Sequence, residues 1–253
     1  MATLISWTDE TWNPTTGCSK VSEGCRFCYA EALSLRFGWS KKPWTAPNAM
    51  ENVVLHPERL RKPYTWKKPS RVFVNSMSDL FHEQVPDAFI AEAFAVMTDT
   101  PQHTYQVLTK RPERAATWPG PWPANIWMGT SVEDQRVSGR IDALRDSGAQ
   151  TKFLSCEPLI GRISASLAGI DWVIAGGESG RHMKPGNPRW MEQEWARHLR
   201  DLALEAGAAF FFKQDSGIRT EMRPWLVEED GSCWEWHQFP GHHSAPARVN
   251  VAA

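Results

Sequence analysis

The sequence predicts an α/β protein built on a parallel sheet, arranged as a partial or a complete (β/α) barrel. Short apolar runs rich in β-formers recur along the chain, and each is followed by polar or glycine-containing residues and then by a helix-like stretch. The runs are almost continuously apolar, which is typical of strands buried on both faces. Strands that alternate with helices indicate βαβ units and therefore a parallel sheet.

Six apolar runs are the predicted strands of this sheet, at residues 71–75, 105–109, 125–129, 152–156, 171–175 and 209–213. Residues 4–7 add a candidate first strand, which makes about seven strands against the eight of a complete barrel. Amphipathic stretches predict helices over residues 28–37, 87–97, 132–146 and 189–205. A glycine follows the first and the last of these helices closely, as is common at helix ends.

The domain organisation is expected to be simple. We find no internal repeat and no linker, so residues 1–253 are predicted to form one domain. Residues 41–70 hold many prolines and asparagines among basic and aromatic residues and predict an extended excursion. Residues 218–253 are expected to form a small C-terminal appendage, with a hairpin that turns at Asp230-Gly231 and a loose tail from Pro240 onward.

Charge and composition exclude several classes of protein. The 253 residues carry 28 Lys and Arg against 29 Asp and Glu, so a formal net charge of −1 provides no whole-surface attraction for nucleic acid. No uncharged apolar stretch approaches the roughly 18 residues of a membrane span, and the first ten residues lack the features of a signal peptide. We therefore expect a cytoplasmic protein with no membrane partner, in which five cysteines form no disulfide framework.

Three of the cysteines form a tight group with ligand-like spacing, Cys18, Cys25 and Cys28. Thiolates are soft ligands, and three of them on one loop can converge on zinc or on an iron-sulfur cluster. Three ligands leave one metal position open, whereas a structural zinc normally recruits a fourth protein ligand. Three buried structural cysteines and a Cys3His zinc site are the alternatives, although the loop itself contains no histidine.

Polar side chains recur where the predicted strands end. In open parallel sheets and in barrels, functional groups lie beyond the carboxyl ends of the strands. The candidates for catalysis at these ends are Lys110, Glu133, Glu157 and Lys213. The two lysines have an alternative interpretation as solvated charges. Asp79 and Gly176-Gly177 also have structural alternatives, a helix cap and a simple turn respectively.

The cysteine loop resembles the cluster loop of radical S-adenosylmethionine enzymes. The usual spacing there is Cys-x3-Cys-x-aromatic-Cys, and this chain has six residues in the first gap but keeps the aromatic residue, Phe27, before the last cysteine. From about Ile5 to Gly217 the chain also resembles a phage and mobile-element family of uncharacterised three-cysteine-motif, radical-SAM-like proteins. The motifs that carry this resemblance are Trp12-Asn13-Pro14, the cysteine loop, residues 75–82, Leu108-Thr109-Lys110-Arg111-Pro112, Gly129-Thr130-Ser131-Val132-Glu133, Glu157-Pro158-Leu159, residues 176–180 and Phe212-Lys213-Gln214. Asp215 and Cys156 depart from what we expect in relatives.

The resemblance implies a cofactor and a chemistry. The three cysteines would hold a [4Fe-4S] cluster, and its open iron would chelate S-adenosylmethionine. An external one-electron donor would then allow a 5′-deoxyadenosyl radical to form, and this radical would abstract hydrogen from a substrate. The residues that would bind S-adenosylmethionine are Phe27, Ser76, Ser78, Asp79, Gly176, Gly177 and Glu178.

The substrate is expected to be nucleic acid. Residues 59–71 interleave basic and aromatic side chains, which suits phosphate contacts and base stacking, while a solvated loop with docked aromatics is the structural alternative. A distant likeness to radical enzymes that repair thymine photoproducts favours DNA or nucleobase repair or modification. Two other functions stay open: a barrel hydrolase that uses Glu133, Glu157 and Glu178, and a non-catalytic zinc- or cluster-stapled module that binds nucleic acid or a partner protein.

Overall fold

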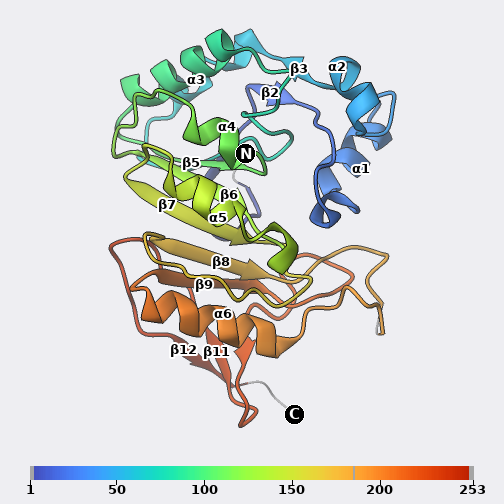
Figure 1. Cartoon of the computed structure of the whole chain (residues 1–253), viewed down its shortest axis with the longest axis vertical. Helices are drawn as coiled ribbons and strands as arrows, with labels where there is room; N and C mark the ends of the chain where they lie inside the picture. Colours follow the sequence, from blue (N-terminus) through green and yellow to red (C-terminus); the bar gives the residue numbers. More distant parts are fainter. Residues whose placement is uncertain (1–2, 185, 251–253) are drawn as a thin grey trace. The chain divides into compact units, whose positions relative to one another are not determined.

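The structure, a computed structural model, describes residues 3–184 and 186–250 and divides the chain into two compact units (Figure 1). Residues 1–130 with 146–150 form the first unit, and residues 131–145 with 151–253 form the second. The largest sheet has seven strands in the order β1-β4-β5-β6-β7-β8-β9. The protein therefore has an α/β fold, and the seven strands of this sheet in the described part of the chain match a partial barrel.

The first unit contains the parallel strands β1, β4, β5 and β6, which pair in that order. The strands are β1 (Glu10–Trp12), β4 (Arg71–Val74), β5 (Thr104–Thr109) and β6 (Ile126–Ser131), and only the last residue of β6 is assigned to the second unit. Two helices connect consecutive strands, α3 (Asp87–Asp99) between β4 and β5 and α4 (Pro112–Ala116) between β5 and β6. This is the βαβ order that the sequence predicts.

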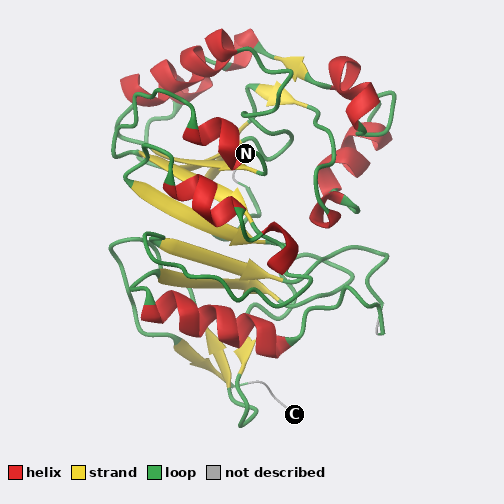
Figure 2. Cartoon of the chain, in the orientation of Figure 1, coloured by secondary structure: helices red, strands yellow, loops and turns green. Residues whose placement is uncertain are grey.

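The long connection between β1 and β4 consists mainly of loops and short helices (Figure 2). It contains α1 (Tyr29–Arg36), α2 (Ala49–Asn52) and a small antiparallel pair formed by β2 (Thr15–Thr16) and β3 (Val54–Leu55). Trp44 is buried, and its backbone N–H donates to Glu31 Oε1 at 2.8 Å. The predicted excursion at 41–70 is thus anchored at its start, while most of its basic side chains after Leu60 are exposed.

The second unit has its own layers. Strands β7 (Thr151–Cys156), β8 (Trp172–Gly176) and β9 (Ala209–Gln214) pair in parallel, and α6 (Gln193–Glu205) contacts β8, β9 and β10. A short helix, α5 (Arg140–Arg145), contacts β7. A separate antiparallel sheet contains β10 (Leu226–Val227), β11 (Cys233–Glu235) and β12 (Ala247–Val249), as Figure 1 shows below α6.

The strands of the sheet are apolar because both of their faces are covered. All five residues of β8 are buried, as are the first four residues of β9. Three consecutive phenylalanines, Phe210, Phe211 and Phe212, are almost fully buried. Each contributes about 1.5–3 kcal/mol of hydrophobic stabilisation relative to an exposed ring. A continuous apolar run, rather than an alternating one, is therefore the pattern that a doubly covered strand requires.

Several predicted elements are confirmed and others are wrong. The six predicted strands from residue 71 onward are observed as β4 to β9, and the helices at 28–37 and 87–97 are observed as α1 and α3. The first strand is not at residues 4–7 but at Glu10–Trp12. Residues 5–8 instead form a turn, in which the backbone N–H of Thr8 donates to Ile5 O and the buried Trp7 packs against Phe73, with ring centroids 4.7 Å apart.

Two predicted helices are shorter than expected. Within 132–146 only Arg140–Arg145 is α-helical, because Asp134 accepts a hydrogen bond from the backbone N–H of Arg136 and diverts the chain into a 3-10 turn before Gly139. The helix expected at 189–205 begins at Gln193, since Arg189 is held in the preceding loop. The predicted loose tail contains a strand, because β12 pairs with β11. In the described part of the chain, no helix has the length and apolarity that a membrane crossing needs.

Candidate cofactor site

The cysteine loop occupies the carboxyl-end side of β1 in the first unit. It begins at Gly17, whose φ of +84° is left-handed and where a Cβ atom would lie 1.8 Å from the carbonyl oxygen of Asn52. Only glycine fits such a position. The loop then passes through a 3-10 turn at Glu23–Cys25 and reaches Cys28, the residue that immediately precedes α1.

The loop that follows β4 holds the cysteine loop in place. The backbone N–H of Gly17 donates to Met77 O at 3.0 Å, and the hydroxyls of Thr15 and Ser78 lie 2.6 Å apart. On the other side of the cysteines, Tyr29 Oη donates to Ser76 O at 2.6 Å. Two of the serines predicted to bind a cofactor therefore lie beside the cysteine loop, where they support its backbone.

Asn75 is a residue of this loop that the sequence analysis did not single out. Its φ of +65° is left-handed, a conformation that asparagine tolerates better than most residues. Its amide donates from Nδ2 to Thr15 Oγ1 at 2.8 Å, while the buried Oδ1 atom has no hydrogen-bond partner among the described residues. A buried acceptor without a donor carries a cost, so a ligand that donates to this oxygen would be stabilised here.

Asp79 joins the ends of β4 and β5. Its carboxylate accepts hydrogen bonds from Thr109 Oγ1 at 2.6 Å, from the backbone N–H of Phe81 at 3.0 Å and from the backbone N–H of Lys110 at 3.1 Å. The Arg111 guanidinium adds an ion pair at 3.1 Å. The carboxylate is thus fully engaged within the protein and organises the strand ends.

Arg111 connects this carboxylate to the first cysteine, which lies 93 positions earlier in the sequence. Its Nη1 atom donates to Cys18 Sγ at 3.6 Å, its Nη2 atom to Ser19 Oγ at 2.9 Å and its Nε atom to Glu83 Oε2 at 2.8 Å. In the sequence, only its position after a strand and its place in the Leu108–Pro112 motif mark Arg111 as a candidate site residue. The contact with the cysteine loop appears only in the tertiary structure.

Cys25 interacts electrostatically with both Cys18 and Cys28. Burial, with smaller contributions from the Asp79 carboxylate and Cys25, raises the pKa of Cys18 to about 12 against the opposing effect of Arg111. Burial also raises the pKa of Cys28, while backbone N–H groups at the start of α1 and the Lys110 ammonium oppose this shift. The thiol of Cys18 donates to Ser19 O at 3.4 Å, and Cys25 Sγ lies 3.7 Å from Ser22 Oγ.

Burial therefore favours the neutral thiol over the thiolate at Cys18 and Cys28. Among the residues that the structure describes, no three His, Cys, Asp or Glu side chains are arranged so as to hold a metal ion. Phe27, which precedes the last cysteine, is exposed, and the Arg26 guanidinium carbon lies 5.3 Å from the centroid of its ring.

The predicted glycine-rich segment belongs to the second unit. A Cβ atom on Gly177 would lie 2.3 Å from the backbone nitrogen of Ser216, so this glycine is required by the close approach of the chain after β9. Glu178 accepts two hydrogen bonds from Arg189, at 2.6 and 2.7 Å. A Cβ atom on Gly176 would lie 3.0 Å from Glu157 Oε1. This segment is packed and its carboxylate is paired.

The other candidates for catalysis in the second unit are also paired. Lys213 Nζ lies 3.0 Å from Glu157 Oε1, and the buried Glu133 accepts from Arg140 Nη1 at 3.1 Å. Burial raises the pKa of the Cys156 thiol, and the Glu133 and Glu157 carboxylates contribute in the same direction. Lys110 lies in the first unit, beside the cysteine loop.

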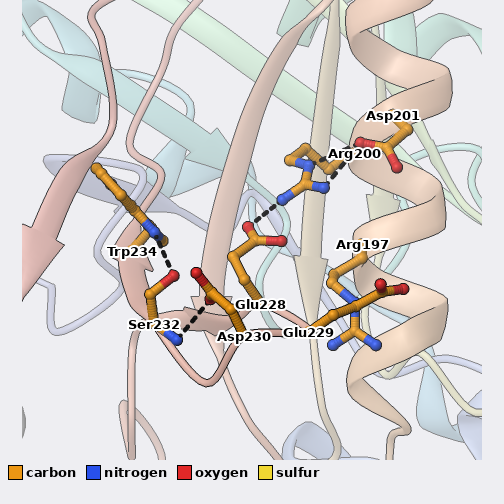
Figure 3. A pocket seen from close by; sticks show the side chains of 8 residues that line it. All are labelled: Arg197, Arg200, Asp201, Glu228, Glu229, Asp230, Ser232 and Trp234. Atoms are coloured by element: carbon orange, nitrogen blue, oxygen red, sulfur yellow. Dashed lines mark hydrogen bonds and ion pairs between the residues drawn. The ribbon is translucent and has the colours of Figure 1, made fainter.

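The second unit also contains an open pocket of about 560 Å³ that none of these predictions involves (Figure 3). Its walls come from α6 and from the turn between β10 and β11. Arg200 pairs with both Glu228 and Asp201, and Trp234 Nε1 donates to Ser232 Oγ at 2.9 Å, so these polar groups bond mostly to one another. The residues that line the pocket are Arg197, Arg200, Asp201, Glu228, Glu229, Asp230, Ser232 and Trp234.

Comparison with known proteins adds one finding. A family model with the description "Protein of unknown function (DUF5131)" matches residues 2–240, which covers most of each unit. No curated protein and no solved structure matches the chain. The function must therefore be argued from the residues of the site.

Proposed function

The chain belongs to the DUF5131 family of proteins of unknown function, and for this member we propose an iron-sulfur enzyme that uses S-adenosylmethionine for radical chemistry. Cys18, Cys25 and Cys28 would be the three protein ligands of a [4Fe-4S] cluster. The observation that carries the proposal is the attachment of this three-cysteine loop to the ends of β4 and β5.

The donor set suits such a cluster. Three sulfur ligands on one loop leave a fourth iron open, and cysteine thiolates are the ligands that iron-sulfur clusters take. Loading requires three thiolates, and the Arg111 guanidinium at Cys18 and the Lys110 ammonium near Cys28 offset part of that negative charge. The amino terminus of α1, directly after Cys28, adds a further favourable electrostatic contribution.

The residues around the cysteines would bind the second cofactor. Asn75 Oδ1 is a buried acceptor without a partner among the described residues, and an amino group such as that of S-adenosylmethionine is the kind of donor it lacks. Ser76, Ser78 and Asp79 would act by holding the loop that presents Asn75. Phe27 would offer its exposed ring to the adenine. With both cofactors bound, the site would supply radical chemistry: one electron from an external donor would cleave the sulfonium carbon–sulfur bond of S-adenosylmethionine to methionine and a 5′-deoxyadenosyl radical, which would take a hydrogen atom from the substrate.

We place nucleic acid first among the substrates, for DNA or nucleobase repair or modification. Arg61, Lys62, Lys67 and Lys68 are exposed, and none of them forms an ion pair among the described residues. Such unpaired cations are available to phosphates. The aromatic ring of Trp66 is used within the protein, since it packs edge-on against His103 with centroids 5.6 Å apart.

The pairing of the glutamates argues against the hydrolase alternative. A glycosidase needs one carboxyl group that is protonated and one that is free to attack or to activate water. Glu133, Glu157 and Glu178 are each held in an ion pair with a cationic side chain, so none of the three is free for either role. The non-catalytic zinc module uses the same three cysteines, so metal content separates it from the radical enzyme.

The proposal is tested by anaerobic reconstitution of the full chain with iron and sulfide. We expect the brown colour and visible absorption of a [4Fe-4S] cluster, and release of 5′-deoxyadenosine from S-adenosylmethionine after reduction. Cys18→Ser, Cys25→Ser and Cys28→Ser should each lose both signals. Cys233→Ser, a change at a half-buried cysteine of the C-terminal sheet, is the matched control and should keep them.

A colourless protein with stoichiometric zinc and no cleavage of S-adenosylmethionine would refute the radical enzyme and support the binding module. A glycosidase activity that survives Cys18→Ala would instead support the hydrolase.

A further inference from the structure

The C-terminal end of α1 presents two stacked aromatic rings to solvent. The rings of Phe37 and Trp39 have centroids 5.2 Å apart and planes inclined by 29°. The two residues are 56% and 62% exposed. Aromatic side chains normally bury most of their surface, so a stacked pair this open calls for a ligand.

The backbone holds this pair in place. The N–H of Trp39 donates to Ser34 O at 2.8 Å and the N–H of Gly38 donates to Leu35 O at 3.3 Å, with Gly38 at a φ of +71°. This is the Schellman arrangement of a helix end, in which the residue at the position of Trp39 usually makes an apolar contact with the residue at the position of Ser34. Because Ser34 is small and polar, the indole stacks on Phe37 instead and stays open to solvent.

The surroundings of the pair are apolar and cationic. Of the twelve exposed large apolar side chains in the described part of the chain, six lie between Val21 and Trp39. The Arg36 guanidinium carbon lies 5.5 Å from the centroid of the Phe37 ring. Neither Arg36 nor the exposed Lys41 forms an ion pair within the described residues, whereas the neighbouring Lys42 is neutralised by a carboxylate at 2.6 Å.

We propose that Phe37 and Trp39, with Arg36 and Lys41, form a binding site for single-stranded nucleic acid. Base stacking on open aromatic rings and phosphate contacts with unpaired cations are the two interactions that such strands require. A duplex keeps its bases stacked inside and cannot use the rings. The proposal deepens the proposed function, because it rests on nucleic acid as the substrate and assigns the surface that holds it.

The site lies at a distance from the cysteine loop that a short strand can span. The eight residues of α1 cover about 12 Å between Cys28 and the aromatic pair. A strand that stacks on the aromatic pair can therefore extend along α1 to the cysteine loop.

The test uses the metal-free full chain and a fluorescent single-stranded oligothymidylate of about 12 nucleotides, with binding measured by anisotropy. We expect Phe37→Ala and Trp39→Ala each to weaken binding about tenfold, and Trp39→Phe to restore most of the affinity. Arg36→Gln with Lys41→Gln should lower the slope of log affinity against log salt by about 0.7 for each phosphate that the protein no longer neutralises. Leu204→Ala, at an exposed apolar residue of α6, is the control and should bind like the wild type.

Both alanine variants should keep the wild-type circular dichroism and melting curve, because both rings are exposed. Unchanged binding in the folded Phe37→Ala and Trp39→Ala variants would overturn the proposal. Equal affinity for a duplex of the same length, or capture of a protein without any binding of the oligomer, would overturn it as well. The binding assay needs no cluster, so Cys18→Ser should bind the oligomer like the wild type. If reconstituted protein binds the oligomer but does not cleave S-adenosylmethionine, the proposed enzymatic function fails and the binding site stands.

Discussion

Replacing Arg111 by methionine removes the side chain that connects the cysteine loop to the end of β5. Methionine keeps most of the length and the apolar stem but loses the hydrogen bonds to Cys18 and Ser19 and the ion pairs with Asp79 and Glu83. Asp79 is almost fully buried, so its charge would lose its cationic partner. The change therefore weakens the loop and leaves a buried carboxylate less compensated.

The loss of stability in Arg111→Met depends on the hydrogen bonds that Asp79 keeps. Removing one partner of a buried ion pair typically costs about 3–5 kcal/mol when the other charge is left uncompensated. Asp79 would keep three hydrogen bonds, from Thr109, Phe81 and Lys110, so we expect a decrease of about 2 kcal/mol in the free energy of unfolding. In a chain of this length, that decrease lowers the melting temperature by about 4–8 °C.

Thermal melting and thiol labelling test this prediction together. Labelling of Cys18 by a thiol reagent, located by mass spectrometry, should be faster in Arg111→Met than in the wild type, because the loop opens more often. Arg111→Lys should lie between the two, since lysine keeps the charge but not the forked geometry.

The matched control is Arg26→Met on the same loop. Arg26 pairs with Glu23 at 3.1 Å, with side chains 62% and 39% exposed, so its removal should cost less than about 0.5 kcal/mol. If Arg111→Met melts and labels like Arg26→Met, then the network does not hold the cysteine loop and the reasoning is refuted.

Two other predictions follow from backbone geometry and from burial. Gly17→Ala should lower the free energy of unfolding, measured in urea, by about 3 kcal/mol or more, because its Cβ would overlap the carbonyl oxygen of Asn52. Gly38→Ala has a similar positive φ but open space around the Cβ, so it should lower this free energy by only about 1–2 kcal/mol. Equal decreases in the two variants would contradict the steric argument. Burial raises the pKa of Asp215 despite its ion pair with Arg223 at 3.0 Å. A raised pKa favours the folded state most below the unfolded pKa of about 4, and this contribution disappears as the pH rises through the folded value. Asp215→Asn should therefore be more stable than the wild type at pH 7 and equally stable below about pH 4, and a less stable variant at pH 7 would show that the ion pair dominates.

The parallel sheet could be predicted from the sequence because its strands carry their own signal. The runs that became β4 to β9 are apolar on both faces, and this pattern depends on burial alone. The three residues of β1, Glu10, Thr11 and Trp12, carry no such pattern, so their pairing with β4 came only from the structure. Likewise β12 is exposed or half-buried, and only its partner β11 identifies it as a strand.

The helix boundaries show the limit of local patterns. Residues 132–139 have helix-like periodicity, but the side chain of Asp134 accepts a hydrogen bond from the backbone N–H of Arg136 and prevents an α-helix from forming there. Arg189 was expected to start a helix, yet it forms a bidentate pair with Glu178, which is eleven positions earlier. In both places one polar contact outweighs the small free-energy differences of helix propensity.

In the candidate site too, some features could be predicted from the sequence and others depend on the tertiary structure. Their spacing and residue type were sufficient to identify a candidate ligand set, because the chemistry of a thiolate belongs to the residue itself. The roles of Arg111 and Asn75 and the open aromatic pair at Phe37 and Trp39 depend on which distant atoms the fold brings within a few ångströms. Hydrogen bonds and desolvation act only over such short distances, so these features were decided by the tertiary structure.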